Sequence, residues 1–179
     1  DYVLTQDIDA SDTMNWNDGA GFVPLGCPVP FTGTLDGNGF IIDSLFINNL
    51  IPGAALFAYV GSDAEVCNLG LSNVSVVSGM TVAAPFAVNV MGGSFVNCWA
   101  SGSVSGESAG YGFGGGGGTL TNCYTTCAIL SGDIRHGFCA EGAVVTSCYW
   151  DTEASGQATS GGGTGKTTAE MKNPLTFPW

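Results

Sequence analysis

Short segments in which apolar and polar residues alternate recur along the chain at a nearly constant interval. Residues 86–100, 111–125 and 136–150 align without gaps at an offset of 25 residues. Residues 57–71 align in the same frame 29 residues upstream, and a fifth copy runs through residues 41–47. A repeat of this length predicts stacked coils, because each unit buries its apolar side against the next unit.

The alignment places similar residues in columns. Side chains of a strand alternate between its two faces, so apolar columns two positions apart are expected to point inward together. The predicted apolar columns are Phe57, Phe86, Tyr111, His136; Leu35, Tyr59, Val88, Phe113, Phe138; Ile42, Val66, Phe95, Leu120, Val145; and Leu45, Leu69, Cys98, Cys123, Cys148. A polar column of Ser44, Asn68, Asn97, Asn122 and Ser147 predicts a corner, since Asn tolerates left-handed backbone and its amide can bind its copy in the next coil.

These columns predict an all-β fold, a right-handed parallel β-helix (β-solenoid) of about six coils. We expect the solenoid over residues 1–150, with an irregular first coil at 1–30 and repeats at 31–150. Residues 151–179 are rich in Gly, Ser and Thr and predict an extended C-terminal strap. The competing fold is an immunoglobulin-like sandwich, but a fixed period with in-register identity favours parallel stacking over hairpins.

Several phrases resemble one known family. They are FTGTLDGNGFIIDSLFINN, NLGLSNVSV, GGSFVNCWASGSVSG and CYWDTEASGQATSGGGTGKTTAEMK, in this order along the chain. Together they resemble the GLUG-repeat family of secreted bacterial and archaeal surface proteins. The resemblance implies a right-handed β-helix in adhesins and secreted modules, with no shared catalytic residues. The chain departs from the family pattern in the run Gly114–Gly118 and in Arg135 with His136.

Charge narrows the range of partners. The formal net charge is −12, and the fixed cations are Arg135, Lys166 and Lys172. A nucleic-acid backbone or an anionic membrane surface would be repelled. No apolar run approaches the roughly 18 residues that span a bilayer, and a chain that begins at Asp1 fits a trimmed secreted protein. We therefore expect an extracellular or cell-surface location without membrane insertion.

Seven cysteines would suit an oxidising compartment. Cys98, Cys123 and Cys148 share a column with Leu45 and Leu69, so they are expected to be buried hydrophobic side chains rather than metal ligands. Cys127 and Cys139 bracket one connection and form a candidate disulfide, and Cys27 with Cys67 is the remaining candidate pair. Asn73-Val74-Ser75 is a candidate N-glycosylation sequon.

Other candidate chemistry is weak. Asp7, Asp9, Asp12 and Asp18 offer oxygen ligands of the kind calcium takes, but a solvated acidic face is the favoured interpretation. No other cofactor is expected. GGGTGKTT at residues 161–168 resembles a phosphate-binding loop, yet Ser160 stands where its first glycine belongs, and no flanking strand or helix is predicted.

Three functions compete. The first is a non-enzymatic structural subunit of a head-to-tail filament, because an open solenoid leaves unpaired backbone at each end. In that assembly Leu175, Phe177 and Trp179 would anchor in a neighbouring copy. The second is a monomeric adhesin or glycan-binding module, with Trp16, Trp99, Trp150 and Trp179 as candidate contacts to glycans or cell surfaces. The third is a polysaccharide-degrading enzyme, which would need a carboxylate pair in a groove, drawn from Asp36, Asp43, Asp63, Glu65 or Glu141.

Overall fold

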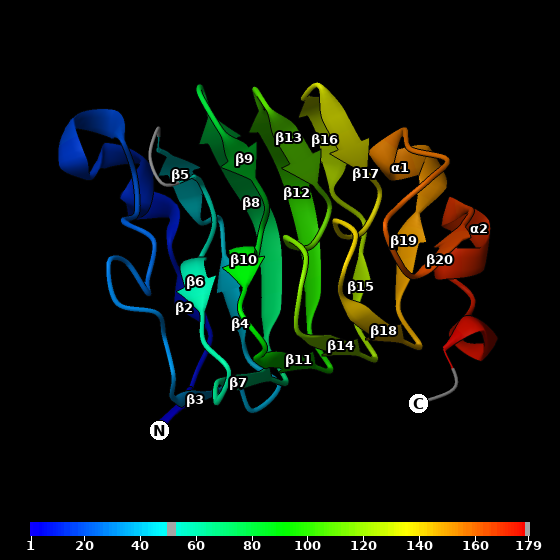
Figure 1. The fold of residues 1–179 in the computed structure, drawn as a ribbon, viewed down its shortest axis with the longest axis horizontal. Coiled ribbons are helices and arrows are strands. Elements are labelled where there is room, and N and C mark those ends of the chain that lie inside the picture. Colours follow the sequence, from blue (N-terminus) through cyan, green and yellow to red (C-terminus); the bar gives the residue numbers. More distant parts are fainter. Residues whose placement is uncertain (50–52, 178–179) are drawn as a thin grey trace.

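The chain winds into a parallel β-solenoid of about four turns. The computed structural model describes residues 1–49 and 53–177. Its largest walls are a six-stranded and a nine-stranded sheet, completed by a three-stranded and a two-stranded sheet (Figure 1). Every pairing between named strands is parallel, as expected for coils stacked in one direction.

The six-stranded sheet forms the base in Figure 1. Its strands, in spatial order, are β1 (Tyr2–Val3), β3 (Thr34–Asp36), β7 (Glu65–Cys67), β11 (Ser94–Val96), β14 (Thr119–Thr121) and β18 (Val144–Thr146). Successive coils add one strand each, and the middle residues Leu35, Val66, Phe95, Leu120 and Val145 lie in register. Three members of this column, Val66, Phe95 and Leu120, are buried.

The nine-stranded sheet forms the long wall. Its main path is β2 (Ile8–Asp9), β4 (Ile41–Asp43), β8 (Gly70–Ser78), β12 (Trp99–Gly106), β15 (Tyr124–Thr125), β19 (Tyr149–Asp151) and β20 (Thr164–Lys166). Two more strands join it, β5 (Phe46–Asn48) beside β8 and β16 (Ala128–Ser131) beside β12. The long strands β8 and β12 therefore give this wall its continuity.

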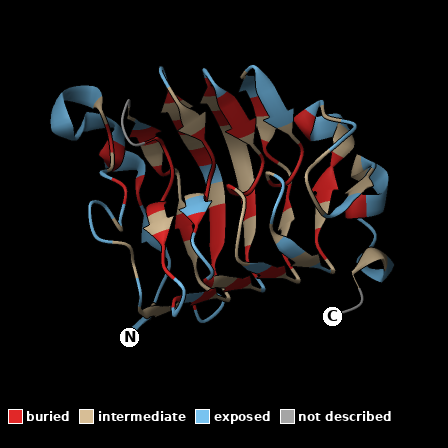
Figure 2. Cartoon of the chain, in the orientation of Figure 1, coloured by how far each residue is buried: buried red, intermediate tan, exposed pale blue. Residues whose placement is uncertain are grey.

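The remaining wall closes each coil. It contains β6 (Phe57–Val60) with β10 (Ala87–Val90), and β9 (Val82–Ala83), β13 (Ala109–Tyr111) and β17 (Ile134–His136) in the three-stranded sheet. Figure 2 shows buried residues on all the walls that surround the core.

The predicted polar corner is present between the six-stranded and nine-stranded sheets. Asn68, Asn97, Asn122 and Ser147 all have left-handed backbone, with φ between 51° and 54°. The Nδ2 of Asn122 donates to Oδ1 of Asn97 at 3.2 Å, and Asn97 donates to Asn68 at 3.0 Å. The side-chain amides of Asn97 and Asn122 thus each bind the equivalent Asn of the preceding coil.

The register of the first repeat was predicted wrongly. Ser44 is also left-handed, but Asp43 pairs with Ser72, which aligns Ser44 with Asn73 at a different corner. Likewise Leu35, not Ile42, pairs with Val66, because residues 37–40 form an additional turn between β3 and β4. In that turn the backbone N–H of Asn38 donates to Oδ1 of Asp36 at 2.7 Å, a side-chain-capped turn of the kind Asp favours.

The aromatic columns are also shifted from the prediction. Phe86, Phe113 and Phe138 stack on consecutive coils, with ring centroids 4.5 Å and 4.9 Å apart. The first step spans 27 residues rather than 25 (113 − 86), since Ala87 bridges Gly114. The run Gly114–Gly118 accommodates this step, because a Cβ on Gly115 would collide with the backbone carbonyl of Val88.

The coil count and the tail differ from expectation. The prediction of six coils counted the irregular N-terminal segment and the partial last coil, whereas about four turns are formed. Residues after Asp151 are not an extended strap. They form α1 (Thr152–Ser155), β20, α2 (Thr168–Met171) and η3 (Pro174–Thr176), and β20 adds in parallel to β19. No helix among the described residues is long and apolar enough to cross a membrane.

Candidate functional site

The N-terminal end of the solenoid is open. Strands β1 and β2 stand last in their sheets, and within residues 1–49 and 53–177 each pairs on one side only, β1 with β3 and β2 with β4. The outward backbone groups of such edge strands can bind a further strand. In Figure 1 this blue end lies at the left, opposite the C-terminal helices.

Large apolar side chains are exposed around this end. They belong to the first coil, whose loops are coloured largely as exposed at the left of Figure 2. The exposed side chains are Tyr2, Val3, Ile8, Met14, Trp16, Val23, Leu25 and Val29. A group of exposed apolar side chains of this kind indicates an interaction surface.

Two hollows lie among these residues. The smaller, of about 290 Å³, is lined by apolar side chains that include Leu4, Phe22, Leu25 and Leu56, with Asp9 and Asp12 also in its lining. The larger, of about 1010 Å³, opens beside Tyr2, Val29 and Phe31. Both hollows expose apolar residues of the first coil. In the other coils, the equivalent apolar surface is covered by the neighbouring coil. The sequence alignment did not reveal the hollows, because this coil does not follow the repeat.

The irregular first coil is nevertheless anchored. Thr13, in η1 (Ser11–Asn15), is buried; its hydroxyl donates to the carbonyl of Ala10 at 2.6 Å and accepts the N–H of Phe46 at 2.9 Å. The following η2 (Asn17–Gly19) leads to Gly26, where a Cβ would collide with the carbonyl of Tyr59. This end is therefore a defined surface with its own hydrogen bonds.

The four N-terminal carboxylates proposed for calcium are not gathered into one site. Asp7 Oδ1 accepts the N–H of Ile41 at 3.0 Å, and Asp9 Oδ1 accepts the N–H of Ser11 at 2.9 Å. The Ser11 hydroxyl, followed by this N–H, lowers the pKa of Asp9. Asp12 and Asp18 lie in η1 and η2. Across the part of the chain that the structure describes, no group of three or more His, Cys, Asp or Glu side chains could hold a metal ion.

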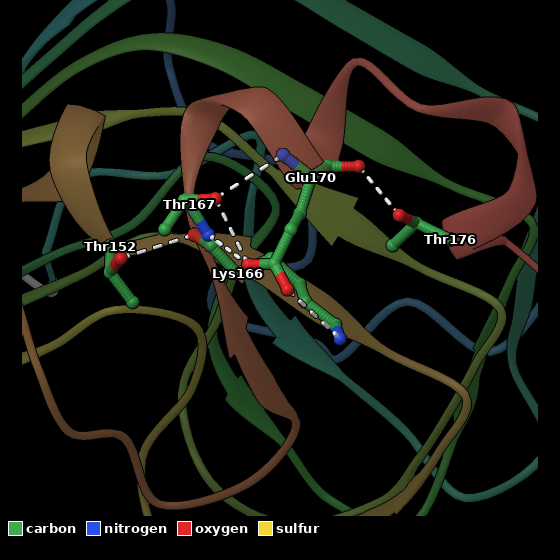
Figure 3. A network of polar contacts seen from close by, with 5 residues as sticks. All are labelled: Thr152, Lys166, Thr167, Glu170 and Thr176. Atoms are coloured by element: carbon green, nitrogen blue, oxygen red, sulfur yellow. Dashed lines mark hydrogen bonds and ion pairs between the residues drawn. The ribbon is translucent and has the colours of Figure 1, made fainter.

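The C-terminal end is covered instead of open on the side of the nine-stranded sheet. Asp151, almost fully buried, accepts the N–H groups of Glu153 and Ala154 at 2.9 Å each and the hydroxyl of Thr168. Thr167 and Glu170 form a capping box at the start of α2, and the hydroxyl of Thr176 donates to the carbonyl of Glu170 at 2.6 Å (Figure 3). These contacts fold the tail back over the last coil.

The glycine-rich segment before α2 does not offer a free phosphate cradle. The strand β20 lies within residues 161–168 instead of before them, and α2 begins at Thr168, so the prediction that no helix follows the segment was wrong. The Glu170 carboxylate accepts the N–H of Thr167 at 2.8 Å and lies 3.8 Å from the Lys166 ammonium (Figure 3). An internal carboxylate thus occupies the groups that would bind phosphate, and its own pKa is lowered by the Thr167 hydrogen bonds.

The first residues of β12, β15 and β19 are Trp99, Tyr124 and Tyr149, which lie in register and form a row of aromatic side chains along the long wall. Trp99 and Tyr124 are parallel, with ring centroids 5.9 Å apart and planes 8° apart. The opposite side of the indole lies against Gly70, where a Cβ would come within 2.6 Å of two ring atoms. Phe177 packs against Tyr124 and Tyr149 at 5.3 Å and 5.6 Å. The indole therefore has neighbours on both sides, which leaves little of its flat surface for a sugar.

The other tryptophans differ in environment. Trp150 is buried, and its Nε1 donates to the carbonyl of Gln157 at 3.0 Å. Trp16 is exposed at the open end. Trp179 lies outside the described residues.

Two of the five carboxylates considered for hydrolysis, Asp36 and Asp43, are hydrogen-bonded within turns of the coil. Asp43 accepts hydrogen bonds from Ser72, Ser44 and Asn73, and these donors lower the pKa of Asp43. Asp36 accepts Nδ2 of Asn68 at 3.0 Å and the N–H of Asn38, which likewise lower its pKa. Both groups are thereby held as anions, which suits turn stabilisation better than a general acid, whose pKa must be raised.

Asn73 and His136 differ in their exposure and their partners. Asn73 is exposed, although its amide donates to Asp43 at 2.8 Å, so the sequon stays a prediction. His136 packs on Tyr111 with ring centroids 5.7 Å apart, and its Nδ1 is buried with no hydrogen-bond partner among the described residues.

All seven cysteines are free thiols in the structure. The structure therefore shows neither of the candidate disulfides Cys127–Cys139 and Cys27–Cys67, and the members of each pair lie in different parts of the coil. Cys127 follows β15 in the long wall, whereas Cys139 bridges Gly114 in the closing wall; Cys67 lies in β7 and Cys27 in the first-coil loop. Cys98, Cys123 and Cys148 are buried on consecutive coils, and the N–H of Cys123 lies 3.3 Å from the Sγ of Cys148. Burial raises the pKa of Cys127 and of Cys139 to about 12.

Comparison with known proteins adds a partial relationship. Part of the chain is similar to halomucin. The match to this protein of Haloquadratum walsbyi (strain DSM 16790 / HBSQ001) is 39% identical over 115 residues and covers 59% of the chain. The chain spans about 1% of the length of halomucin. No family model matches the chain, and no solved structure matches it.

Proposed function

We propose that the chain is a non-enzymatic structural β-solenoid of the cell surface or extracellular space, and a subunit of a head-to-tail filament. The observation that carries the proposal is the open N-terminal end, where β1 and β2 have no outer neighbour among the described residues and apolar side chains surround two hollows. Burial of apolar surface stabilises an interface by roughly 25 cal/mol per Å². A second solenoid end would satisfy both the backbone edges and the apolar surface.

Charge supports a contact between unlike ends. The first coil holds five aspartates and no Lys or Arg: Asp1, Asp7, Asp9, Asp12 and Asp18. The last third of the chain holds all three fixed cations together with five acids, so its formal charge of −2 is less negative than the −5 of the first coil. Such an arrangement favours head-to-tail contact over contact between two acidic N-terminal ends. Repetition of one unlike contact produces an open fibre rather than a closed dimer.

The similarity to a protein named as a mucin supports an extracellular or secreted location. Membership of the GLUG-repeat family and right-handed coiling are parts of the same proposal, because nearly all parallel crossovers are right-handed. Monomeric adhesion or glycan binding is less well supported, since Trp99 is enclosed between Gly70 and Tyr124. The hydrogen bonds that hold Asp36 and Asp43 as anions argue against hydrolysis.

The test is the mass and shape of the purified chain. Light scattering should show growth in mass with concentration, and negative-stain micrographs should show fibres one solenoid wide. Val3→Asp at the open edge should shorten or abolish the fibres, because it places charge on an apolar contact. Met91→Asp, at a residue 54% exposed between β10 and β11, is the matched control and should leave assembly unchanged. A chain that stays monomeric at high concentration would overturn the proposal.

A further inference from the structure

The C-terminal tail presents one apolar side chain to solvent in an ordered conformation. Leu175, in η3, is 89% exposed, the highest value among the exposed large apolar residues. Its N–H donates to Oδ1 of Asn173 at 3.0 Å, and its neighbour Thr176 is bound to Glu170. Phe177 fastens the segment to Tyr124 and Tyr149. A leucine held in this way loses little conformational entropy when it binds a partner.

At the opposite end, the hollow of about 290 Å³ is suited to an apolar side chain. Its lining consists mainly of apolar residues, among them Phe22, Leu45 and Leu56. The carboxylates of Asp9 and Asp12 belong to the same lining. A partner should therefore offer an apolar group together with a nearby cation.

The tail carries such a cation. Lys172 is exposed and stands three residues before Leu175. Within residues 1–49 and 53–177 the structure has one ion pair, between Lys166 and Glu170, so the Lys172 ammonium is available for an intermolecular carboxylate. Apolar group and cation thus match the apolar hollow and its two carboxylates.

One chain cannot make this contact with itself. The lining of the hollow includes residues 4–25 of the first coil, which stand at the N-terminal end at the left of Figure 1, whereas η3 follows α2 in the C-terminal tail at the right. The six strands of the base sheet alone separate the ends by about 24 Å at about 4.8 Å per strand. The occupant must come from another molecule, and a second copy carries the matching groups.

We propose that Leu175 of one copy inserts into the hollow between the first coil and β4 of the next copy, with Lys172 facing Asp12 and Asp9 at its opening. This inference rests on the proposed head-to-tail assembly and assigns its joint. In this joint the unpaired backbone groups of the edge strands contribute affinity for any strand. Leu175 and Lys172 select the N-terminal end of another copy as the partner.

Substitution of Leu175 is the first test. Leu175→Asp should raise the concentration at which half of the chains are assembled by about 10- to 100-fold, the range expected for loss of one buried leucine. Leu175→Met should keep assembly, because it preserves apolar volume. Met91→Asp serves again as the control for an added surface charge.

A charge exchange is the second test. Lys172→Glu alone and Asp12→Lys alone should each weaken assembly by up to about five-fold, as expected for an exposed ion pair. The double variant should recover wild-type assembly, which a general change in net charge would not produce. Circular dichroism and the urea midpoint of each variant should match the parent, so that loss of folding is not mistaken for loss of the joint.

The outcomes separate the two proposals. If the parent forms fibres and neither Leu175→Asp nor the charge variants change them, the joint is wrong and the filament stands. If the parent is monomeric at every concentration, the filament and the joint both fall. Recovery by the double variant together with sensitivity to Leu175→Asp would establish the joint.

Discussion

The two ends of the solenoid differ in how far their edge strands and apolar core residues are covered. Any stack of coils exposes backbone edges and an apolar core at its first and last members. At the C-terminal end, α1, β20 and α2 cover the last coil, and Asp151 and Thr167 satisfy the helix starts. At the N-terminal end, the coil is irregular, its edges are open and its apolar side chains are exposed. The difference is that the C-terminal end covers most of its last coil and presents Leu175 beside the cover, whereas the N-terminal end leaves its apolar interior open.

The largest expected difference between the ends concerns their tryptophans. Trp150 is 6% exposed under the C-terminal cover, whereas Trp16 is 50% exposed at the open end. Trp150→Ala should lower the free energy of unfolding by about 3–5 kcal/mol, and Trp16→Ala by less than about 1 kcal/mol. Urea unfolding of dilute, monomeric protein measures both. Equal losses would show that the open end is packed as tightly as the closed one.

Buried polar anchors should show a smaller difference. Asp151→Ala removes the acceptor for two helix N–H groups and the Thr168 hydroxyl, so it should cost about 2 kcal/mol. Thr13→Val removes one hydroxyl from the N-terminal anchor and should cost about 1 kcal/mol. Thermal unfolding ranks the two variants; a larger effect of Thr13→Val would reverse the comparison.

Acid should loosen the N-terminal half first. The pKa values of Asp9, Asp36 and Asp43 are lowered in the folded chain, so their stabilising effect is complete above the unfolded value of 3.8 and is lost as pH falls through the lower folded values. Asp43→Asn should reduce this loss of stability between pH 4 and about pH 2. Amide hydrogen exchange at stepped pH would follow it strand by strand. Unchanged acid sensitivity in Asp43→Asn would contradict the assignment.

The reactivity of the cysteine thiols should differ between the open first coil and the packed coils, and this is the smallest of the expected differences. Cys27 is exposed in the first coil and should react first with an alkylating reagent at pH 8. Burial raises the pKa of Cys67 to about 11, with Asp36 and Glu65 adding to the shift, so Cys67 should react slowly. Cys127 and Cys139 should react only as the chain unfolds. Mass spectrometry counts the labels, and resistance of these two residues in denaturant without reductant would reveal a disulfide.

The repeat allowed much of the middle of the molecule to be predicted. The Asn corner and the column from Val66 to Val145 follow from periodicity, because parallel coils place equivalent residues next to one another. The frame of the first repeat could not be predicted in this way, since the turn at residues 37–40 adds length that the apolar pattern does not reveal. The shift at Phe113 has the same origin, a difference in connection length hidden within a run of glycines.

The candidate site was only partly visible beforehand. Open ends and tail residues such as Leu175 were expected to take part in assembly, because a solenoid without caps exposes its core. The hollows were not foreseen, since they arise where Phe22, Leu25 and Leu56 meet from segments without a common period. The cover over the last coil was missed as well, because α1 and α2 are too short to show a helical pattern.

By itself, then, the sequence determined the solenoid class, the acidic charge and the identity of the stacked core residues, because these depend on composition and on a local repeat. Only the tertiary structure decided which coil lies against which, that the tail folds back, and that the two ends differ. Those features depend on contacts between residues far apart in the chain. Asp151 with Thr168 and Thr13 with Phe46 are such contacts, and their hydrogen bonds form only after the coils have stacked.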